Sequence, residues 1–111
     1  MSGKTNVTEF TPLLKEAYSH LALGRVNDHT AYLMNFKGTY PMHSHTRDEL
    51  YFVLEGEVTV RFKNSPPETL KKGECLSVLA YVSHSSESQE GALVLMVKPT
   101  DMFATPLEVV E

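Results

Sequence analysis

Apolar and polar side chains alternate along most of the chain from Thr30 onward, and this period of two predicts β-strands. In the run 49–55, Glu49, Tyr51 and Val53 fall on one face and bulky apolar residues fall on the other. Since both faces are largely apolar, such a strand is expected to pack in two directions, between two sheets or against a second subunit. Strands are predicted at 30–37, 49–55, 58–62, 68–70, 75–81 and 92–98.

Turn residues separate these runs at short intervals. Gly56 and Gly73 mark tight turns, Pro66 and Pro67 mark a loop, and the polar stretch 83–91 is expected to be loop-like except near its start. Many short strands joined by such turns predict an all-β fold, either a β-sandwich or a closed barrel. A barrel of about eight strands leaves an interior wide enough for side chains or one small ligand.

The segment before these strands has a different pattern. Residues 1–10 show no clear period and are expected to form a loose arm or an edge strand. Thr11 and Pro12 then predict the start of a short helix, because threonine caps helices and proline suits the first turn. Gly24 would end this helix. Apolar residues follow the start at helical spacing: Leu13, Leu14, Ala17, Tyr18 and Leu21.

A length of 111 residues corresponds to one domain, 1–111. Its strand-rich core is expected over about 27–99, after an N-terminal arm and helix at 1–26 and before a tail at 100–111. The tail has little period, although three apolar residues could add an edge strand: Leu107, Val109 and Val110.

Composition describes an ordinary soluble globular protein, with 41% apolar and 22% charged residues. The net charge of −4 and the pI near 5.7 argue against a nucleic-acid-binding or anionic-membrane surface. No apolar run approaches the length of a membrane span and no leader pattern is evident, so a cytoplasmic location is expected. The single cysteine, Cys75, excludes an internal disulfide and is expected to pack as a small apolar strand residue.

Candidate chemistry lies in GTYPMHSHTRDELYFVLEG, residues 38–56. His43 and His45 are two apart, so a strand would point both imidazoles at one spot, and Glu49 opens the following strand. Neutral imidazoles and a carboxylate that converge from adjacent strands make a transition-metal site. A fourth ligand should come from elsewhere in the chain, and His84 is the candidate.

Simpler roles are expected for the other polar residues near these strands. His20 would lie near the end of the predicted helix, where a cation suits the helix dipole, and His29 is interpreted as a loop residue. Asp48 neighbours the inward Glu49, so its side chain is expected to point to the surface and to pair there with Arg47.

The spacing of the first candidate ligands resembles the first sequence motif of the cupin superfamily. Gly38, His43, His45, Glu49 and Gly56 occur in the order and nearly the spacing of that motif. The chain has four residues between the first glycine and the first histidine, where the motif usually has five.

A second stretch, residues 73–88, is similar to the second cupin motif in part. Gly73 and His84 stand at the matching positions, whereas Leu79, Tyr81 and Ser88 replace its proline, second glycine and asparagine. If the turn needs a positive φ, tyrosine adopts it only at a cost, so the loop before His84 is expected to be reshaped.

The resemblance looks closest to small single-domain cupins described as like mannose-6-phosphate isomerase. It implies a double-stranded β-helix, or jelly-roll barrel, and often a homodimer. It also implies one divalent transition metal, with iron, manganese, nickel, zinc and copper all open. The implied metal ligands are His43, His45, Glu49 and His84.

Two classes of function are left open. The first is an enzyme, a metal-dependent dioxygenase or isomerase that transforms a small polar metabolite such as a sugar, keto acid or enediol. The second is a non-catalytic module that binds or senses a metal or small ligand, and a metal-free structural domain ranks last. No general base stands out apart from the proposed ligands. The expected pocket lining is Tyr32, Met34, Tyr51 and Met96.

The expected partners follow from the same residues. Leu50, Phe52 and Leu54 point away from the barrel interior and need cover from the N-terminal helix or from a second subunit, which predicts a homodimer. A small-molecule ligand or substrate is expected, and neither a nucleic acid nor a membrane is.

Overall fold

A computed structural model describes residues 3–103 of the chain. It begins with the short helix α1 (Val7–Phe10) and the 3-10 turn η1 (Thr11–Leu13), and it ends with the 3-10 turn η2 (Thr100–Phe103). Seven antiparallel strands lie between them: β1 (His20–Val26), β2 (His29–His43), β3 (Glu49–Glu55), β4 (Glu57–Phe62), β5 (Glu68–Lys71), β6 (Cys75–Val78) and β7 (His84–Pro99).

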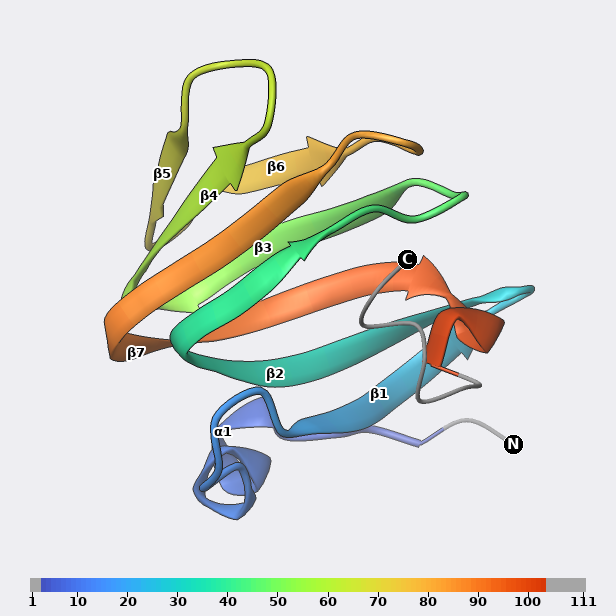
Figure 1. Cartoon of the computed structure of the whole chain (residues 1–111). Coiled ribbons are helices and arrows are strands. Elements are labelled where there is room, and N and C mark those ends of the chain that lie inside the picture. Colours follow the sequence, from blue (N-terminus) through green and yellow to red (C-terminus); the bar gives the residue numbers. More distant parts are fainter. Residues whose placement is uncertain (1–2, 104–111) are drawn as a thin grey trace.

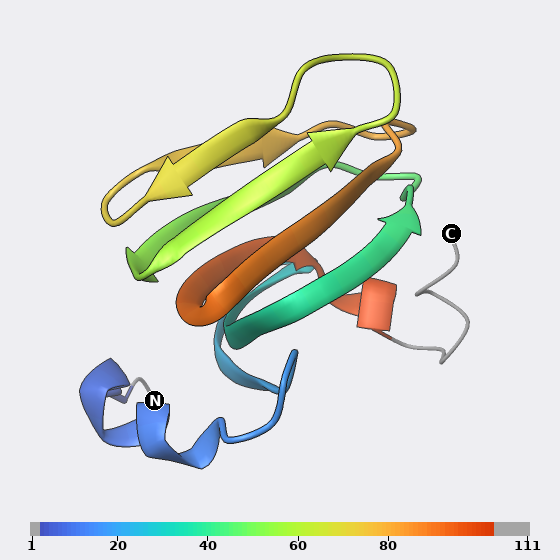
Figure 2. The ribbon, with the colours of Figure 1, turned by 60° about the vertical axis from the view of Figure 1, so that its left-hand side comes forward.

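The strands form a jelly-roll barrel whose two layers share the long strands β2 and β7. The first half of β2 pairs with the second half of β7, and this pair carries β1 on one side and β3 and β6 on the other. The second half of β2 pairs with the first half of β7, which continues to β4 and β5. Figure 1 and Figure 2 show both long strands bending from one layer into the other.

Glycines occupy the points where the backbone bends. Gly38 and Gly91 have φ values of 79° and 95°, and the β2–β7 pairing shifts register between Phe36 and Gly38. Gly56, in the β3–β4 turn, has φ 86°, and a Cβ there would lie 2.5 Å from the carbonyl oxygen of Gly91. Only glycine therefore fits where this turn presses on the bend of β7.

The core consists of rows of side chains that cross three strands on the inner face. Tyr32, Met96 and Tyr51 form one row across β2, β7 and β3, and every member is buried. The same registers align Met34, Val94 and Val53 in the next row. The predicted inward face of 49–55 is thus confirmed, with Glu49, Tyr51 and Val53 all buried.

The predicted strand 49–55 is confirmed residue for residue, and the other predicted strands all exist with altered ends. The prediction that 83–91 forms a loop is wrong, because β7 already begins at His84. His84, Ser86 and Ser88 alternate inward there, and the Ser88 hydroxyl donates a hydrogen bond of 2.7 Å to the carbonyl of Glu57. Small polar residues that face a barrel interior give no apolar alternation, which hid this half-strand.

The predicted helix from Thr11 to Gly24 is also wrong. The 3-10 turn ends at Leu13, an α-helix precedes it at 7–10, and His20–Val26 is the edge strand β1. Backbone hydrogen bonds between Tyr18 and Asn35 and between Asn35 and Ser19 lead the chain into this edge pairing. Pairing with β2 outweighs the local helical spacing of the leucines. The edge strand considered at Leu107, Val109 and Val110 falls outside the described residues.

Apolar side chains also cover much of the outer face of β3 and β7. Leu50, Phe52 and Leu54 are half-buried, and β7 adds Leu93, Leu95 and Val97 beside them. A groove of about 620 Å³ at one end of this face lies between the sheet and the N-terminal helices, and Leu54, Leu95, Val7 and Pro12 are among its lining residues. The N-terminal segment therefore supplies part of the expected cover. Among the described residues no helix is long and apolar enough to cross a membrane.

Candidate metal centre

Three histidines and one glutamate meet inside the barrel. His43 is the last residue of β2 and His84 the first of β7, and the two are direct partners in the β2–β7 pairing. Glu49 is the first residue of β3, and His45 lies in the connection before it. All four are buried. The spacing had predicted that the two motif histidines share a strand. They do not, because β2 ends at His43.

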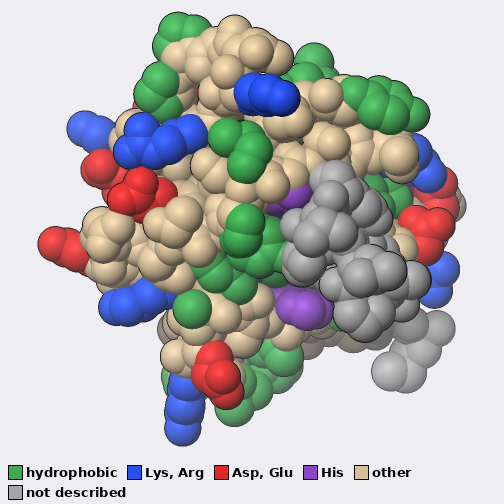
Figure 3. Space-filling model, in the orientation of Figure 1, with side chains coloured by type: hydrophobic (Ala, Val, Ile, Leu, Met, Phe, Trp, Pro, Cys, Tyr) green, Lys and Arg blue, Asp and Glu red, His purple; other side chains and the backbone are tan. Residues whose placement is uncertain are grey.

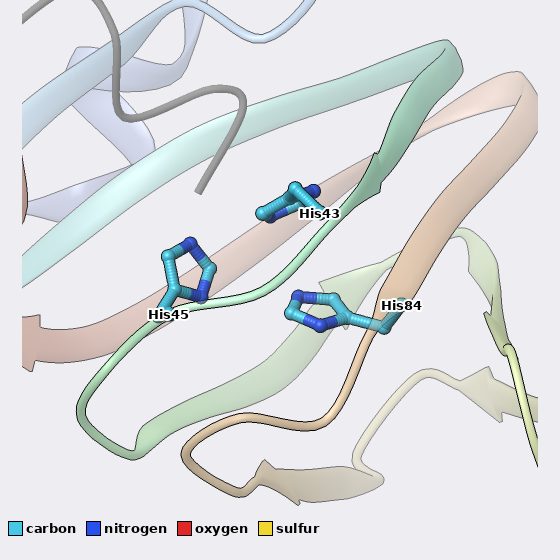
Figure 4. A group of neighbouring side chains, drawn as sticks. All are labelled: His43, His45 and His84. Carbon is cyan, nitrogen blue, oxygen red and sulfur yellow. The ribbon is translucent and has the colours of Figure 1, made fainter.

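The imidazole rings are close enough to face one small volume (Figure 4). The ring centroid of His43 lies 4.6 Å from that of His45 and 4.4 Å from that of His84. One potential ligand nitrogen from each ring lies within 4.8 Å of the others. Two nitrogens on one ion are at most about 4.2 Å apart, so a small contraction lets the three share a cation.

Backbone carbonyls orient two of the rings. The Nδ1 of His43 lies 2.7 Å from the carbonyl oxygen of Pro41, and the Nδ1 of His84 lies 2.9 Å from that of Val82. A carbonyl only accepts, so each Nδ1 carries the proton and each Nε2 keeps its lone pair. This arrangement, in which one ring nitrogen is anchored and the other is free, is typical of metal-binding histidines.

The Glu49 carboxylate lacks the hydrogen bonds that a buried carboxylate needs. Neither oxygen has a hydrogen-bond partner among residues 3–103, and both are shielded from solvent. Its nearest polar neighbours are His84 Nε2 at 3.6 Å, His45 Nδ1 at 3.7 Å and Lys98 Nζ at 3.8 Å. An unsatisfied buried charge is costly, and a cation at this point would remove the cost.

Burial and neighbouring charges set the protonation states. Burial lowers the pKa of His45 to about 4 and also lowers the pKa of His43, so both rings are neutral near pH 7. Burial raises the pKa of Glu49, but the nearby Lys98 side chain favours the ionised carboxylate, and the net shift is downward. Neutral imidazoles and an ionised carboxylate are the forms that bind metal.

Two hydrogen bonds tie the connection before Glu49 to the connection before His84. The Tyr81 backbone N–H donates to the carbonyl of His45 at 2.7 Å, and the Ala80 N–H donates to Asp48 Oδ1, also at 2.7 Å. Tyr81 has φ 66°, so it adopts the left-handed conformation in spite of its side chain. The expected reshaping of this loop is therefore wrong, and His84 reaches the cluster.

Asp48 has a different partner from the expected one. It is exposed, as predicted, but its carboxylate anchors the Ala80 backbone, whereas Arg47 pairs with Asp28 at 3.2 Å. The remaining predictions for single residues also need correction. His20 lies on the edge strand β1 rather than at a helix end, His29 opens β2 rather than lying in a loop, and Cys75 is exposed on β6.

The four residues predicted to line a pocket are all buried on the inner face, as Tyr32, Met34, Tyr51 and Met96. The hydroxyl of Tyr51 lies 3.4 Å from His84 Nε2, which places it beside the cluster. Burial raises the pKa of Tyr51 well above its ordinary value, so the hydroxyl stays protonated.

Sequence reasoning missed one residue at this site. Lys98 is buried, and its ammonium group lies 3.8 Å from Glu49 Oε2. Its position could have been found from the alternation of β7, because residues 92, 94 and 96 point inward and 98 continues the series. Histidine side chains show near the middle of the face in Figure 3, while most charged side chains lie around its edge.

Comparisons with known proteins agree with this architecture. The family model described as "Cupin domain" matches residues 32–98. The uncharacterised protein YdbB of Bacillus subtilis (strain 168) is 32% identical over 99 residues, which cover 88% of each chain. A cupin-2 domain protein from Shewanella frigidimarina superposes with a TM-score of 0.81 at 24% identity, covering 86% of this chain and 93% of that one.

A further solved structure belongs to the group that the sequence resembles. It is a Ralstonia eutropha JMP134 protein described provisionally as a mannose-6-phosphate isomerase, with a TM-score of 0.76 and 16% identity. The match covers 88% of this chain and 98% of that one. At this identity the likeness shows the shared fold and nothing about the reaction.

Proposed function

This chain belongs to the cupin family, and on that basis we propose that it binds one divalent transition metal through His43, His45, Glu49 and His84. The metal serves a small polar metabolite that carries oxygen donors. Iron, manganese, nickel, zinc and copper all suit a set of imidazoles and one carboxylate.

The observation that carries the proposal is the state of Glu49. A carboxylate whose two oxygens are both buried and lack a hydrogen bond within residues 3–103 lies beside three imidazoles. In a metal-free structural domain this arrangement would cost stability, because a buried carboxylate that accepts no hydrogen bond is unfavourable. Coordination of a cation accounts for the carboxylate and for the three inward rings together.

A bound metal would supply Lewis acidity or an oxygen-binding position. The chain's own residues orient and shield that position. Backbone carbonyls fix the rings of His43 and His84, and the protonated Tyr51 hydroxyl can donate a hydrogen bond to a ligand. A hydroxyl with so high a pKa is a poor general base, so Tyr51 does not suit a reaction that begins with proton abstraction.

A ligand-binding or sensing module without turnover is the second candidate. It is favoured by the ionisable groups that are buried at the site among the described residues. Apart from the four proposed ligands, the Tyr51 hydroxyl beside His84 is such a group, and its raised pKa makes it a poor base near pH 7. Oxygen consumption by the iron(II) form with diketones, thiols and hydroxy acids separates the two candidates. Turnover of any of them favours the enzyme, and tight binding without turnover favours the module.

Metal analysis of protein purified without chelator tests the centre itself. Glu49→Gln keeps the size of the side chain but removes its charge, and His45→Ala removes one imidazole. Each is expected to lower metal content or affinity by about tenfold or more. His20→Ala and His29→Ala are matched controls, because neither residue belongs to the group of histidines that could share an ion, so both variants should leave the metal unchanged. Equal metal in all four variants would refute the ligand assignment.

We also propose that the protein works as a homodimer. The outer face of β3 and β7 presents six half-buried apolar side chains, and the N-terminal helices lie over only one end of it. A second copy would remove this face from water, as is common in domains of this size.

A further inference from the structure

Lys98 occupies an inward position that packing does not explain. Lys98 is paired with Thr30 across β2, and on the other side it lies one position beyond the Leu50–Val97 pair, which places it beside Glu49. These three side chains form a polar row next to the apolar row of Tyr32, Met96 and Tyr51. The side chain of Lys98 is only 6% exposed.

A buried ammonium group needs a negative partner. In the protein alone, Glu49 Oε2 at 3.8 Å is such a partner. Among the buried described residues, Glu49 and Lys98 are the two of types that ordinarily carry a charge near pH 7, and these charges have opposite sign. If Glu49 binds a divalent cation, as proposed above, the buried side chains of the described residues do not balance the charge of that cation. Such a charge is costly at low dielectric, so the site should recruit an anion.

The distances limit the size of that anion. The single carboxylate of Glu49 lies 3.6 Å from His84 Nε2 and 3.8 Å from Lys98 Nζ, so the histidine cluster and the ammonium group are within reach of one small group. The Tyr51 hydroxyl, 3.4 Å from His84 Nε2, adds a second hydrogen-bond donor at the same place. Both donors suit a carboxylate, which only accepts.

We propose that Lys98 is an anion-recognition residue and that the ligands of this site are small carboxylates with an adjacent oxygen donor, of the 2-hydroxy or 2-oxo acid class. The carboxylate meets the Lys98 ammonium group, and the ligand oxygens face the space among the imidazoles. This inference rests on the proposed metal centre and narrows its ligand class. The alternative is that Lys98 serves only as the counter-ion of Glu49.

Lactate and lactamide separate these two roles, because they share a skeleton and differ in charge. Calorimetric titration of the cobalt(II)-loaded protein should show tighter binding of lactate than of lactamide. In Lys98→Met the lactate affinity should fall by about tenfold or more, while lactamide binding changes by less than about twofold. Lys98→Arg keeps the charge and should stay within about threefold of the parent protein for lactate.

The outcomes are distinct. Lys98→Met that is folded, loaded with cobalt and still binds lactate like the parent would overturn the inference and leave the metal centre standing. Loss of cobalt from the parent protein itself would overturn the metal centre, and the inference with it. Lys98→Gln is a second neutral variant in case Lys98→Met does not fold. If neither variant folds, the parent protein and Lys98→Arg still test the inference. Equal affinity of the parent for lactate and lactamide would overturn it. A strong preference for lactate, retained in Lys98→Arg, would support it.

Discussion

Glu49 determines the electrostatics of the residues around it. Its carboxylate lies under 4 Å from two imidazoles and from the Lys98 ammonium group, and it is shielded from water. The same environment keeps His43 and His45 neutral, since burial opposes their protonation. Without a metal, His43, His45 and Glu49 therefore each bind a proton less readily in the fold than in the unfolded chain.

This resistance predicts a pH dependence for the metal-free protein. The pKa of His45 is 6.5 in a free side chain and about 4 in the fold, so between these values the unfolded state binds more protons. The free energy of unfolding should be highest above about pH 6.5 and fall by about 2 kcal/mol as the pH drops toward about 4. His43 acts in the same direction, whereas the lowered pKa of Glu49 makes its contribution disappear only at lower pH.

Urea unfolding of chelator-treated protein across this pH range measures the effect. His45→Gln should flatten the slope, because glutamine does not titrate. His20→Gln is a weaker control, since the pKa of His20 is lowered too, by burial first and then by Lys98. A parent protein that is equally stable at both ends of the range would contradict the prediction.

Single residues also show which positions sequence reasoning could place. The four candidate ligands follow from motif spacing and the inward parity of 49–55, and their side chains lie together in the structure, while metal binding by them stays a prediction. Lys98 was not predicted as a site residue, because a lysine next to Pro99 at a strand end usually faces solvent. Only the alternation of inward and outward residues along β7 places it inside. The orientation of His43 by the Pro41 carbonyl is a backbone contact that no side-chain pattern encodes.

Among the elements, the turn between β6 and β7 departs most from the family pattern. Tyr81 stands where the second motif has glycine, it is 75% exposed, and its φ is 66°. The left-handed conformation costs a non-glycine residue roughly 1–2 kcal/mol. The turn persists because the N–H of Tyr81 and the neighbouring Ala80 N–H are both held by the His45–Asp48 segment.

Tyr81→Gly should therefore stabilise the protein. Relief of the backbone strain is opposed by the greater freedom of glycine in the unfolded chain, which leaves a gain of about 0.5–1 kcal/mol. Chemical denaturation measures the change, and metal content should be unaffected. Val82→Gly is the matched control, since its backbone φ is not positive and the substitution should destabilise. A loss of stability in Tyr81→Gly would contradict the prediction. It would show that the Tyr81 side chain stabilises the fold by more than its left-handed backbone destabilises it.

Sequence patterns predicted the elements well where one face is apolar, and poorly elsewhere. Strands β3, β4 and β5 match their predictions closely, because their inward residues are mostly valine, leucine or aromatic. The start of β7 and the whole of β1 were missed for different reasons. The former has serines facing the interior, and the latter is an edge strand with a leucine spacing compatible with a helix.

On the scale of the whole molecule, the jelly roll was predicted from the family resemblance, because turn spacing alone left a sandwich and a barrel open.

The subunit arrangement is still a prediction. The parent protein should sediment as a dimer, and Phe52→Lys should give a monomer, because the charge falls in the middle of the apolar outer face. Leu79→Lys is the control, since Leu79 is already 56% exposed in the turn after β6. A monomeric parent protein at micromolar concentration would contradict the proposal.

The bent pair β2 and β7 has a consequence for how the protein comes apart. Each layer contains half of both strands, so neither layer keeps a complete sheet once the other has opened. Thermal unfolding should consequently be one cooperative transition, without a partly unfolded intermediate that proteases could cleave. His43 and His84 lie at the far end of that pair and would separate in the same event.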